Sequence, residues 1–444
     1  MLLCKSYFCG RAAKLLIEQG ASFKGGLMKP LTVCAALLAA AFSAAAPAAT
    51  HAQDTIRIAL IEPFSGPMAA VGSDFLQGMQ LIVDSINKSG ETLGKKLEII
   101  PLDNAGGVEK TTEQLRKAID DGIVYITQGT SSNNALDIIE QLNKYNERNP
   151  DHPVLFLNHS AVTTSFTNDQ CSFWHFRFDS NVDQKLAGLL TAMGRDHRVK
   201  RVYMLNQNYE LGRSVEAAAT KMFPERVPNA QIVGDELIVP FGKVQDFTPF
   251  VAKLKAANAD SVLTANWGPD VIRFVKAVAD SGLNVQFFTF YGGQAAALSG
   301  YGKDAGLAVH LKQVTETHEN MDQSPDAAAF AALFREKTGK TWYADHTRLM
   351  FLMLAKSMQK AGTTDPKAVA RALEGMALDG PIGEVLMRAE DHQIQMPMVV
   401  SEIDENAPKK FIYNNVDFGV GFGTVTVITR EQATLPTSCK MQRP

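Results

Sequence analysis

The residues of this sequence that could do chemistry lie just after short apolar runs, and almost all of them are uncharged. They are hydroxyl, amide and aromatic side chains, namely Phe64, Ser65, Ser131, Ser132, Ser160, Tyr209, Asn266, Trp267 and Tyr291. Such side chains hold a small molecule through neutral hydrogen bonds and through contact with an aromatic surface. The residue types therefore predict non-covalent binding of a small polar or amphipathic molecule.

Two short stretches in this set point to particular tasks. Ser131 and Ser132 precede a helical pattern, and the free N–H groups and the dipole at a helix N-terminus can hold a carboxylate without a cation. One of the two serines is expected to cap the helix with its side chain instead. Trp267 lies between Asn266 and Gly268 in a predicted turn, which favours the wall of a cleft, with a core position as the alternative.

Motifs of catalysis are absent from the sequence. Gly66 and Gly72 match neither a phosphate-binding loop nor a dinucleotide-binding turn, and Ser214 lacks the following glycine of a hydrolase elbow. His392 stands beside Asp391 without a second cluster of ligating groups, so we interpret it as a structural histidine. We therefore predict no catalytic residue, no metal site, no cofactor and no enzyme activity; a hydrolase site of unfamiliar sequence is the alternative.

Short β-rich runs alternate with helical patterns along most of the chain. Strands are expected at residues 56–61, 97–101, 123–127, 154–157, 173–178, 199–205, 232–239, 261–264 and 285–290. Helices are expected at residues 75–87, 109–119, 135–145, 183–193, 211–222, 247–257 and 269–281. The later segments are helices at 325–337, 343–360 and 366–376, short strands at 384–387, 397–403 and 409–413, and a strand with a tail at 421–444. Two series of βα units predict an α/β fold with two lobes and parallel sheets. Ligands bind beyond the carboxyl ends of such strands, where the polar residues above lie.

The N-terminal region reads as an export signal. Lys29 precedes the apolar run 31–46, which is too short to span a membrane, and small residues follow it. We place cleavage after Ala52, so that residues 1–52 are removed, and suspect that translation starts at Met28. A lipoprotein site at Cys34 is the alternative, although a bulky residue precedes this cysteine. The periplasm is therefore the expected location.

Charge and cysteine content limit the partners and the compartment. The formal net charge of −3 provides no basic field, so nucleic acid is not expected as a partner. Cys171 and Cys439 are the cysteines that remain after the signal, and two thiols in an exported chain most often pair. We predict a disulfide between them, with two buried free thiols as the alternative.

Several short motifs follow the signal in a specific order. They are Ser65-Gly66-Pro67 with Gly72 and Gly78, Ser85-Ile86-Asn87, an apolar strand that ends in Asp103, the turn 129–132 and the segment 387–393. Over almost the whole mature chain this order resembles the periplasmic substrate-binding proteins of branched-chain amino acid ABC importers. The stretches 171–179 and 439–444 look like one subgroup of that family.

The resemblance implies a type I periplasmic binding fold, in which two Rossmann-like lobes joined by three crossovers close over a ligand. The crossovers would lie near residues 178–180, 309–315 and 380–384. Lobe 1 would contain residues 54–178 and 310–381, lobe 2 residues 180–308 and 384–430, and the tail residues 431–444. By the match, Ser132, Ser160 and Val162 contact the ligand from lobe 1, and Tyr209, Asn266, Trp267 and Tyr291 contact it from lobe 2. A monomer that delivers its solute to a membrane permease is also implied.

Three positions depart from the amino acid binders of that family. Val162 replaces a hydroxyl residue that grips the α-ammonium, residues 266–268 replace a turn rich in tyrosine and glycine, and residues 291–294 lack a carboxylate opposite the ammonium. A buried ammonium without a counter-charge is costly. Branched-chain amino acids therefore lead as the expected solute, and an aromatic or other organic acid is the rival. A ligand sensor that delivers no cargo is a further alternative.

Overall fold

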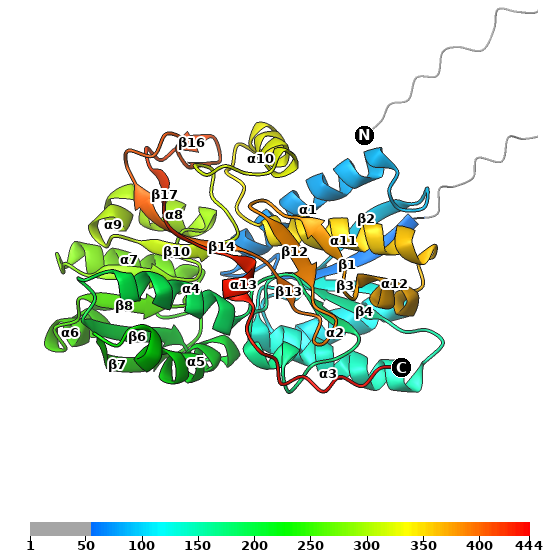
Figure 1. Cartoon of the computed structure of the whole chain (residues 1–444), viewed down its shortest axis with the longest axis horizontal. Coiled ribbons are helices and arrows are strands. Elements are labelled where there is room, and N and C mark those ends of the chain that lie inside the picture. The colour runs from blue at the N-terminus through cyan, green and yellow to red at the C-terminus, as the bar shows by residue number, and fades with distance from the viewer. Residues whose placement is uncertain (1–54) are drawn as a thin grey trace, which may run out of the picture. The chain divides into compact units, whose positions relative to one another are not determined.

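Two sheets covered by helices make up the described part of the chain (Figure 1). The computed structural model describes residues 55–444. The predicted export signal, its cleavage site and the start at Met28 lie outside these residues. Within residues 55–444, no helix is both long enough and apolar enough to cross a membrane.

Lobe 1 is built on a five-stranded sheet with the order β2-β1-β3-β4-β5, in which all pairs are parallel. Its strands are β1 (Thr55–Glu62), β2 (Lys96–Asp103), β3 (Tyr125–Gln128), β4 (Leu155–Asn158) and β5 (His175–Arg177). Its helices are α1 (Ala69–Ser89), α2 (Val108–Asp120), α3 (Ser132–Arg148), α10 (Pro325–Thr338), α11 (Asp345–Ala361) and α12 (Pro366–Leu373), with the 3₁₀ turn η1 (Thr164–Thr167) after β4. The strand order reverses between β1 and β3, which is where sheets of this kind bind ligands.

Lobe 2 repeats this arrangement in a seven-stranded sheet with the order β17-β14-β10-β9-β8-β6-β7. Its strands are β6 (Arg201–Gln207), β7 (Gln231–Ile238), β8 (Ser261–Thr264), β9 (Gln286–Thr289), β10 (Lys312–Thr315), β14 (Met398–Asp404) and β17 (Gly421–Ile428). Its helices are α4 (Val182–Arg195), α5 (Glu210–Arg226), α6 (Thr248–Ala256), α7 (Pro269–Asp280), α8 (Ala295–Tyr301), α9 (Lys303–Ala308) and α13 (Arg430–Ala433). Strand β14 pairs antiparallel with β10 and β17, and the other pairs are parallel. The predicted α/β class with parallel central sheets is confirmed.

Two smaller sheets complete the fold, and one of them corrects the predicted lobe boundaries. One is a two-stranded hairpin of β15 (Ile412–Tyr413) and β16 (Val416–Asp417). The other is a three-stranded sheet of β11 (Ala377–Asp379), β12 (Glu384–Met387) and β13 (Ile394–Gln395). Strand β12 pairs with β11 and β13, and its residues Val385 and Met387 lie in the lobe 1 core, so lobe 2 does not resume at residue 384. Strand β10 pairs with β9, so lobe 1 does not resume at residue 310 either. The crossover expected near residues 309–315 therefore falls on β10, which is a strand of the lobe 2 sheet.

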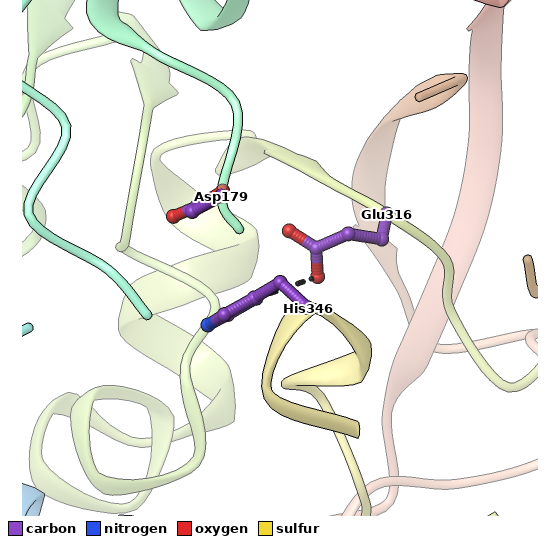
Figure 2. Close-up of side chains that lie close together, drawn as sticks. All are labelled: Asp179, Glu316 and His346. Atoms are coloured by element: carbon purple, nitrogen blue, oxygen red, sulfur yellow. Dashed lines mark ion pairs between the residues drawn. The ribbon is translucent and has the colours of Figure 1, made fainter. Parts of the chain in front are cut away.

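Buried charges lie where the chain crosses between the lobes. Asp179 follows β5, Glu316 follows β10, and His346 lies in the first turn of α11, as Figure 2 shows. Lys185 Nζ on α4 lies 2.7 Å from Asp179 Oδ1 and 3.9 Å from Glu316 Oε1. His346 Nδ1 lies 3.2 Å from Glu316 Oε2. Lys185 and His346 thus face the carboxylates of Asp179 and Glu316. The Lys185 ammonium fills the position between these two acids.

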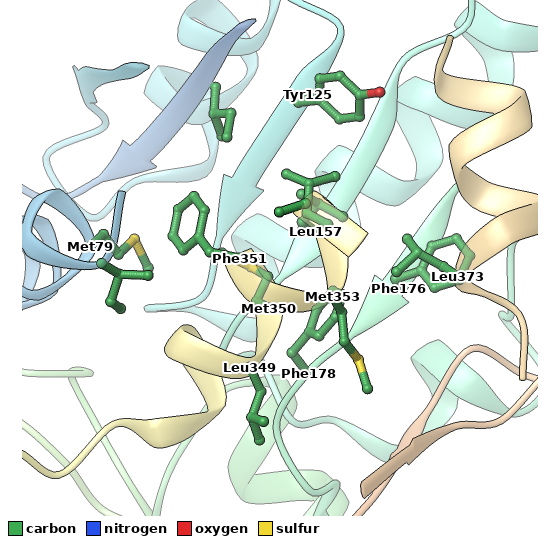
Figure 3. Close-up of a cluster of buried hydrophobic side chains, with 14 of the residues drawn as sticks. Met79, Tyr125, Leu157, Phe176, Phe178, Leu349, Met350, Phe351, Met353 and Leu373 are labelled. Carbon is green, nitrogen blue, oxygen red and sulfur yellow. The ribbon is translucent and has the colours of Figure 1, made fainter. Parts of the chain in front are cut away.

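The lobe 1 core forms on both faces of its sheet because alternate side chains of a strand point in opposite directions. Ile58 and Leu60 of β1 pack against α1, α11 and α12. They belong to a cluster of buried apolar side chains that includes Met79, Leu157 and Phe351 (Figure 3). Ala59 and Ile61 point to the other face, toward α2 and α3. The core fixes the sheet, and the sheet fixes the turns at its edge.

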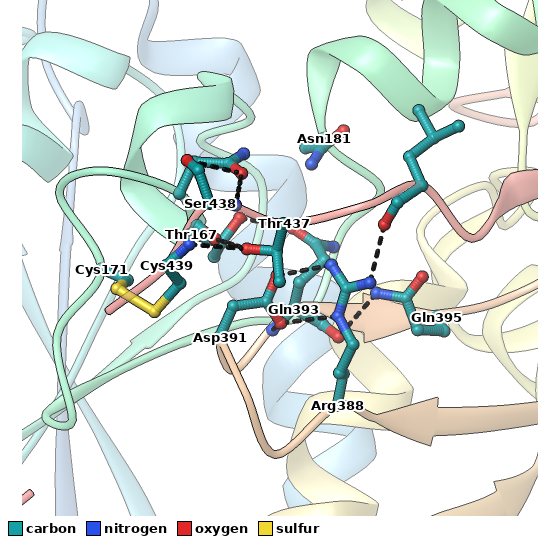
Figure 4. A network of polar contacts seen from close by, with 12 residues as sticks. Thr167, Cys171, Asn181, Arg388, Asp391, Gln393, Gln395, Thr437, Ser438 and Cys439 are labelled. Atoms are coloured by element: carbon teal, nitrogen blue, oxygen red, sulfur yellow. Dashed lines mark hydrogen bonds and ion pairs between the residues drawn. A yellow bond between two sulfur atoms is a disulfide. The ribbon is translucent and has the colours of Figure 1, made fainter. Parts of the chain in front are cut away.

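The C-terminal tail links the two lobes. Gln184 Nε2 of α4 donates to the carbonyl oxygen of Ala433 at 3.1 Å, which holds α13 on lobe 2. Beyond α13 the chain lies along the loop at Thr167, and Cys439 is joined to Cys171 with a Cα–Cα distance of 5.7 Å, as Figure 4 shows. The predicted disulfide is confirmed, and the alternative of two free thiols is wrong.

Candidate functional site

A cavity lies between the two lobes at the carboxyl ends of their strands. The centres of water-sized molecules can occupy about 40 Å³ of it, within about 380 Å³ of space between protein atoms that includes open solvent. Its lining residues are Val71, Phe75, Gly129, Thr130, Ser131, Ser132, Ser160 and Val162 from lobe 1, and Tyr209, Leu211, Trp267, Tyr291 and Gln294 from lobe 2. None of these lining residues carries a charged side chain. Both sheets thus contribute the turns that follow their strands.

Most of the predicted site residues meet at this cavity. Seven of the ten line it: Ser131, Ser132, Ser160, Val162, Tyr209, Trp267 and Tyr291. The turns after β3 and β4 supply the lobe 1 members, and the turns after β6, β8 and β9 supply the lobe 2 members. Their roles in binding remain predictions, but the structure brings them to one place.

The buried carboxylate of Glu62 shapes the lobe 1 wall. Glu62 ends β1, and its Oε1 accepts from the backbone N–H groups of Gly129 at 2.7 Å and Thr130 at 3.2 Å. The Thr130 hydroxyl donates to the other oxygen, Oε2. A Cβ on Gly129 would lie 2.5 Å from the ring of His159 and 2.6 Å from the backbone N of Ser160, so only glycine fits there. The Glu62 carboxylate and the His159 ring therefore fix the conformation of the turn after β3.

Ser131 and Ser132 stand at the start of α3, facing the cavity. The helix begins at Ser132, and Ser131 is its N-cap residue with φ −156° and ψ 126°. No side-chain hydrogen bond caps α3, so the expectation that one of the two serines caps this helix with its side chain is not met. The first N–H groups of a helix lack intrahelical partners. The hydroxyls and N–H groups at this helix start are thus available to an anion.

Aromatic residues form the lobe 2 wall. Trp267 Nε1 donates to Tyr209 Oη at 2.6 Å. The ring of Phe241 packs behind both, with centroids 4.6 Å from Tyr209 and 5.5 Å from Trp267. Burial raises the pKa of the Tyr291 hydroxyl, with a further contribution from the Asp179 carboxylate, so this side chain stays neutral. The wall therefore offers ring faces and hydroxyl groups to a ligand.

Three predicted site residues do not line the cavity. Phe64 packs against the lobe 1 core, and its N–H donates to Asp103 Oδ1 at 2.8 Å. Ser65 is exposed. Burial raises the pKa of the Asp103 carboxyl, but the Ser65 hydroxyl and the N–H groups of Ala105 and Phe64 together outweigh burial and hold that pKa below its ordinary value. The placement of both residues was wrong because the carboxylate at the end of β2 draws this turn away from the cavity. Asn266 does not line the cavity either, and its side chain is fully buried.

Met68, next to this turn, instead contacts lobe 2. A Cβ on Gly268 would lie 2.7 Å from Met68 Sδ, and a Cβ on Gly242 would lie 2.6 Å from Met68 Cε. Gly268 also has a φ of 61°, which favours glycine. A second contact between the lobes is the hydrogen bond that the Glu210 N–H donates to Asn133 Oδ1 at 3.3 Å. The lobes thus touch at two places near the site.

Comparison with known proteins places this arrangement in a family. Residues 55–408 match the sequence profile described as periplasmic binding protein. The chain belongs to this family. It is a family of binding proteins rather than of enzymes, in agreement with the prediction of a non-catalytic site.

Individual relatives of this periplasmic binding protein extend the match over most of the chain. The Leu/Ile/Val-binding protein homolog 4 of Brucella melitensis is 33% identical over 428 residues, which covers 92% of this chain and 98% of the relative. A leucine-, isoleucine-, valine-, threonine- and alanine-binding protein from Brucella ovis, solved in a closed conformation, has a TM-score of 0.79 and 30% identity, covering 88% of this chain and 100% of that one. A solute-binding protein of an R. palustris ABC transporter, solved with 4-hydroxybenzoate, has a TM-score of 0.70 and 21% identity, covering 82% and 96%. The last likeness concerns the fold alone.

Sequence reasoning missed five side chains that line the cavity of this periplasmic binding protein. They are Val71, Phe75, Thr130, Leu211 and Gln294. Thr130 and Gln294 lie in turns whose neighbours were selected, so their positions were available from the sequence. Val71 and Phe75 belong to α1, for which the sequence predicted only residues 75–87. Only the three-dimensional course of α1 past the cavity reveals their exposure to it.

Proposed function

We propose that this periplasmic binding protein is the exported solute receptor of an ABC importer, acts in the periplasm as a monomer and presents its closed form to a membrane permease. The solute is a small molecule with a carboxylate group. The observation that carries this proposal is the uncharged cavity between two lobes, with a helix start on one side and an aromatic wall on the other. A ligand that contacts both walls favours the closed arrangement because it binds that arrangement more tightly.

The carboxylate of the solute would bind at the start of α3. Ser131 and Ser132 present hydroxyls to the cavity there, and a helix N-terminus stabilises an anion by about 0.3–2 kcal/mol. Ser160 and Val162, after the neighbouring strand β4, would contact the part of the solute next to the carboxylate. The absence of a cationic side chain from the lining supports binding by neutral groups and backbone N–H groups.

The apolar part of the solute would lie against lobe 2. Tyr209, Trp267 and Tyr291 offer ring faces that fit either a branched aliphatic chain or an aromatic ring. The names of the Brucella relatives support branched-chain amino acids as the first candidates. The lack of a carboxylate among the lining residues supports an aromatic or other organic acid as the second, since an ammonium would lie there without a direct counter-charge.

A thermal-shift screen against amino acids and aromatic acids tests the proposal. A ligand present at 100 times its Kd stabilises the folded protein by about 2.7 kcal/mol, which raises the melting temperature measurably. We expect at least one small carboxylate to do so, and its amide or ester derivative to have no effect. If no carboxylate stabilises the protein, or if the uncharged derivative works equally well, the proposed solute class is wrong.

Ser132→Ala should weaken binding of the solute found in this screen. Loss of a hydrogen bond to a charged group costs about 1.5–3 kcal/mol, which corresponds to a Kd roughly 10 to 100 times larger. Isothermal titration calorimetry measures the change. Ser65→Ala is the matched control, because Ser65 lies outside the cavity, and its Kd should equal that of the wild type. Equal affinities for the two variants would remove Ser132 from the binding site.

A further inference from the structure

Met68 links the two lobes through an apolar side chain that lies outside the lining of the cavity. Its backbone belongs to lobe 1, where Met68 is the N-cap residue of α1. Its side chain is 7% exposed and belongs to the buried apolar cluster of lobe 2 that also contains Tyr209 and Trp267. Because Met68 is not among the residues that line the cavity, the contacts proposed for the solute do not involve it.

Lobe 1 holds the backbone of Met68 in place. The Met68 carbonyl oxygen accepts from the N–H groups of Val71 at 3.0 Å and of Gly72 at 3.4 Å. A Cβ on Gly72 would lie 2.2 Å from the carbonyl oxygen of Pro63, so the start of α1 packs closely on the turn after β1. The Met68 side chain therefore extends to lobe 2 from a position that lobe 1 fixes.

Gly242 and Gly268 of lobe 2 form a socket that receives this side chain. A Cβ on Gly268 would lie 2.7 Å from Met68 Sδ and 3.3 Å from Met68 Cε. A Cβ on Gly242 would lie 2.6 Å from Met68 Cε, and no other atom of the described residues, apart from Gly242 and its chain neighbours, lies within 4 Å of it. A side chain at either position would take the space of the methionine, so lobe 2 leaves room for Met68 because both residues are glycines.

The Met68 side chain is buried only while the lobes are together, because its backbone lies on one lobe and its socket on the other. Opening of the lobes would transfer both the side chain and the socket to water. Complete burial of a methionine side chain changes an equilibrium constant by roughly 10- to 150-fold. This contribution favours the closed arrangement whether or not a solute is present.

We propose, on the basis of the function proposed above, that Met68 is a positioning residue that holds the lobes together and thereby raises the affinity for the solute without touching it. When only the closed arrangement binds tightly, the apparent Kd equals the Kd of that arrangement divided by its population in the ligand-free protein. The Met68 side chain raises this population by leaving water when the lobes close. It therefore lowers the apparent Kd by the same factor.

Distances between spin labels in the ligand-free protein test the closure itself. The substitutions Lys144→Cys on α3 and Lys221→Cys on α5 place one label on an exposed position of each lobe, and the native cysteines are paired. Electron spin resonance should show a closed population that is at least about fivefold smaller in the Met68→Ala variant. Equal closed populations with and without Met68, or no closed population in either protein, would overturn the proposal.

Calorimetry with the solute found in the screen tests the effect on affinity. Met68→Ala should raise the Kd by the factor by which it lowers the closed population. Met68→Leu should stay closer to the wild type than Met68→Gln, because leucine is apolar whereas glutamine, which is nearer to methionine in shape, is polar. Met222→Ala is the matched control, since Met222 packs against the same cluster from α5 within lobe 2, and it should leave the Kd unchanged.

The possible outcomes separate this proposal from the proposed function. An unchanged Kd for Met68→Ala, or an equal increase for Met222→Ala, would overturn the role of Met68. Failure of every acid to bind, together with the expected loss of the closed population in Met68→Ala, would reject the proposed function and leave the closure by Met68 standing.

Gly242→Ala tests the socket from the other lobe. The added Cβ would displace Met68 Cε, so this variant should raise the Kd about fivefold or more. In the Met68→Ala background the same substitution should change the Kd by less than about twofold, because the methionine is gone. The φ of 67° at Gly242 strains an alanine, but lobe 2 carries this strain in the open and the closed arrangement alike. Equal effects in the two backgrounds would show that Gly242 and Met68 act independently and would contradict the socket.

Discussion

Replacing Arg177 by methionine is expected to lower the free energy of unfolding by about 3–5 kcal/mol. The Arg177 side chain is fully buried. Its Nε donates to Gln393 Oε1 at 2.6 Å, and its terminal nitrogens donate to the Thr163 carbonyl oxygen and to the Thr167 hydroxyl. Methionine has a similar length but no donor. Each acceptor that loses its buried partner costs about 1–3 kcal/mol.

The charge of Arg177 adds to this loss. Burial lowers the pKa of the guanidinium to about 10, while the carboxylates of Asp391, Asp179 and Asp183 oppose that effect. The side chain is therefore cationic at neutral pH and offsets part of the charge of these three acids. Removing one partner of a buried charge network leaves the others uncompensated, which is more costly than replacing all of them.

Urea denaturation of the purified variant measures the effect. Arg198→Met is a matched control, because the Arg198 side chain is 60% exposed and pairs with Asp196 at the surface, so its removal should change the free energy of unfolding by less than about 0.5 kcal/mol. An Arg177 variant that unfolds at the same urea concentration as the Arg198 variant would show that the buried network adds no stability.

The turns that form the cavity were predictable because the α/β pattern places the carboxyl ends of parallel strands at one edge. Ser132, Ser160, Tyr209 and Trp267 each follow a strand whose apolar run is plain in the sequence. Once the strands are assigned, the residue types in the turns that follow them predict the lining of the cavity. The aromatic wall and the uncharged lining both follow from this local information.

Contacts between distant parts of the chain were not predictable in this way. Ser160 and His346 are separated by 186 positions, and nothing in the residues near either one indicates that their side chains meet. Ser65, after β1, interacts with Asp103 at the end of the neighbouring strand β2 and does not line the cavity. Nothing in the sequence near either residue indicates this interaction. The same limit explains the shifted lobe boundary at β10, whose membership in the second sheet depends on pairing with β9.

The segment after β4 connects the site to the stability of the fold. Asn158 Oδ1 accepts from the N–H of Ala161 at 2.8 Å, and Asn158 Nδ2 donates to the carbonyl oxygen of the same residue at 2.8 Å. His346 Nε2 lies 2.9 Å from Ser160 Oγ, and Arg177 donates to the carbonyl oxygen of Thr163. Contacts within the protein thus hold this part of the cavity wall, and a wall held in this way loses less entropy on binding.

Replacing Cys171 and Cys439 together by serine is expected to lower the free energy of unfolding by about 2–5 kcal/mol. The cross-link joins residues separated by 268 positions, so it strongly restricts the unfolded chain. The folded tail keeps other contacts: the Ser438 N–H donates to Asn168 Oδ1 at 2.9 Å, and Arg371 donates to the carbonyl oxygen of Pro444 at 2.7 Å. The folded structure should therefore persist in the variant.

Urea denaturation with and without a reducing agent separates the cross-link from the side chains that form it. The reduced wild type should unfold at the same urea concentration as the serine variant, and the variant should not respond to reduction. Ser438→Ala, which keeps the bridge, should remain within about 0.5 kcal/mol of the wild type. The slope of the transition should also rise when the bridge is lost, because an unfolded chain without a cross-link exposes more surface. Equal midpoints for the oxidised wild type and the serine variant would contradict the expected loss, and a lower midpoint with an unchanged slope would place the effect of the bridge in the folded tail.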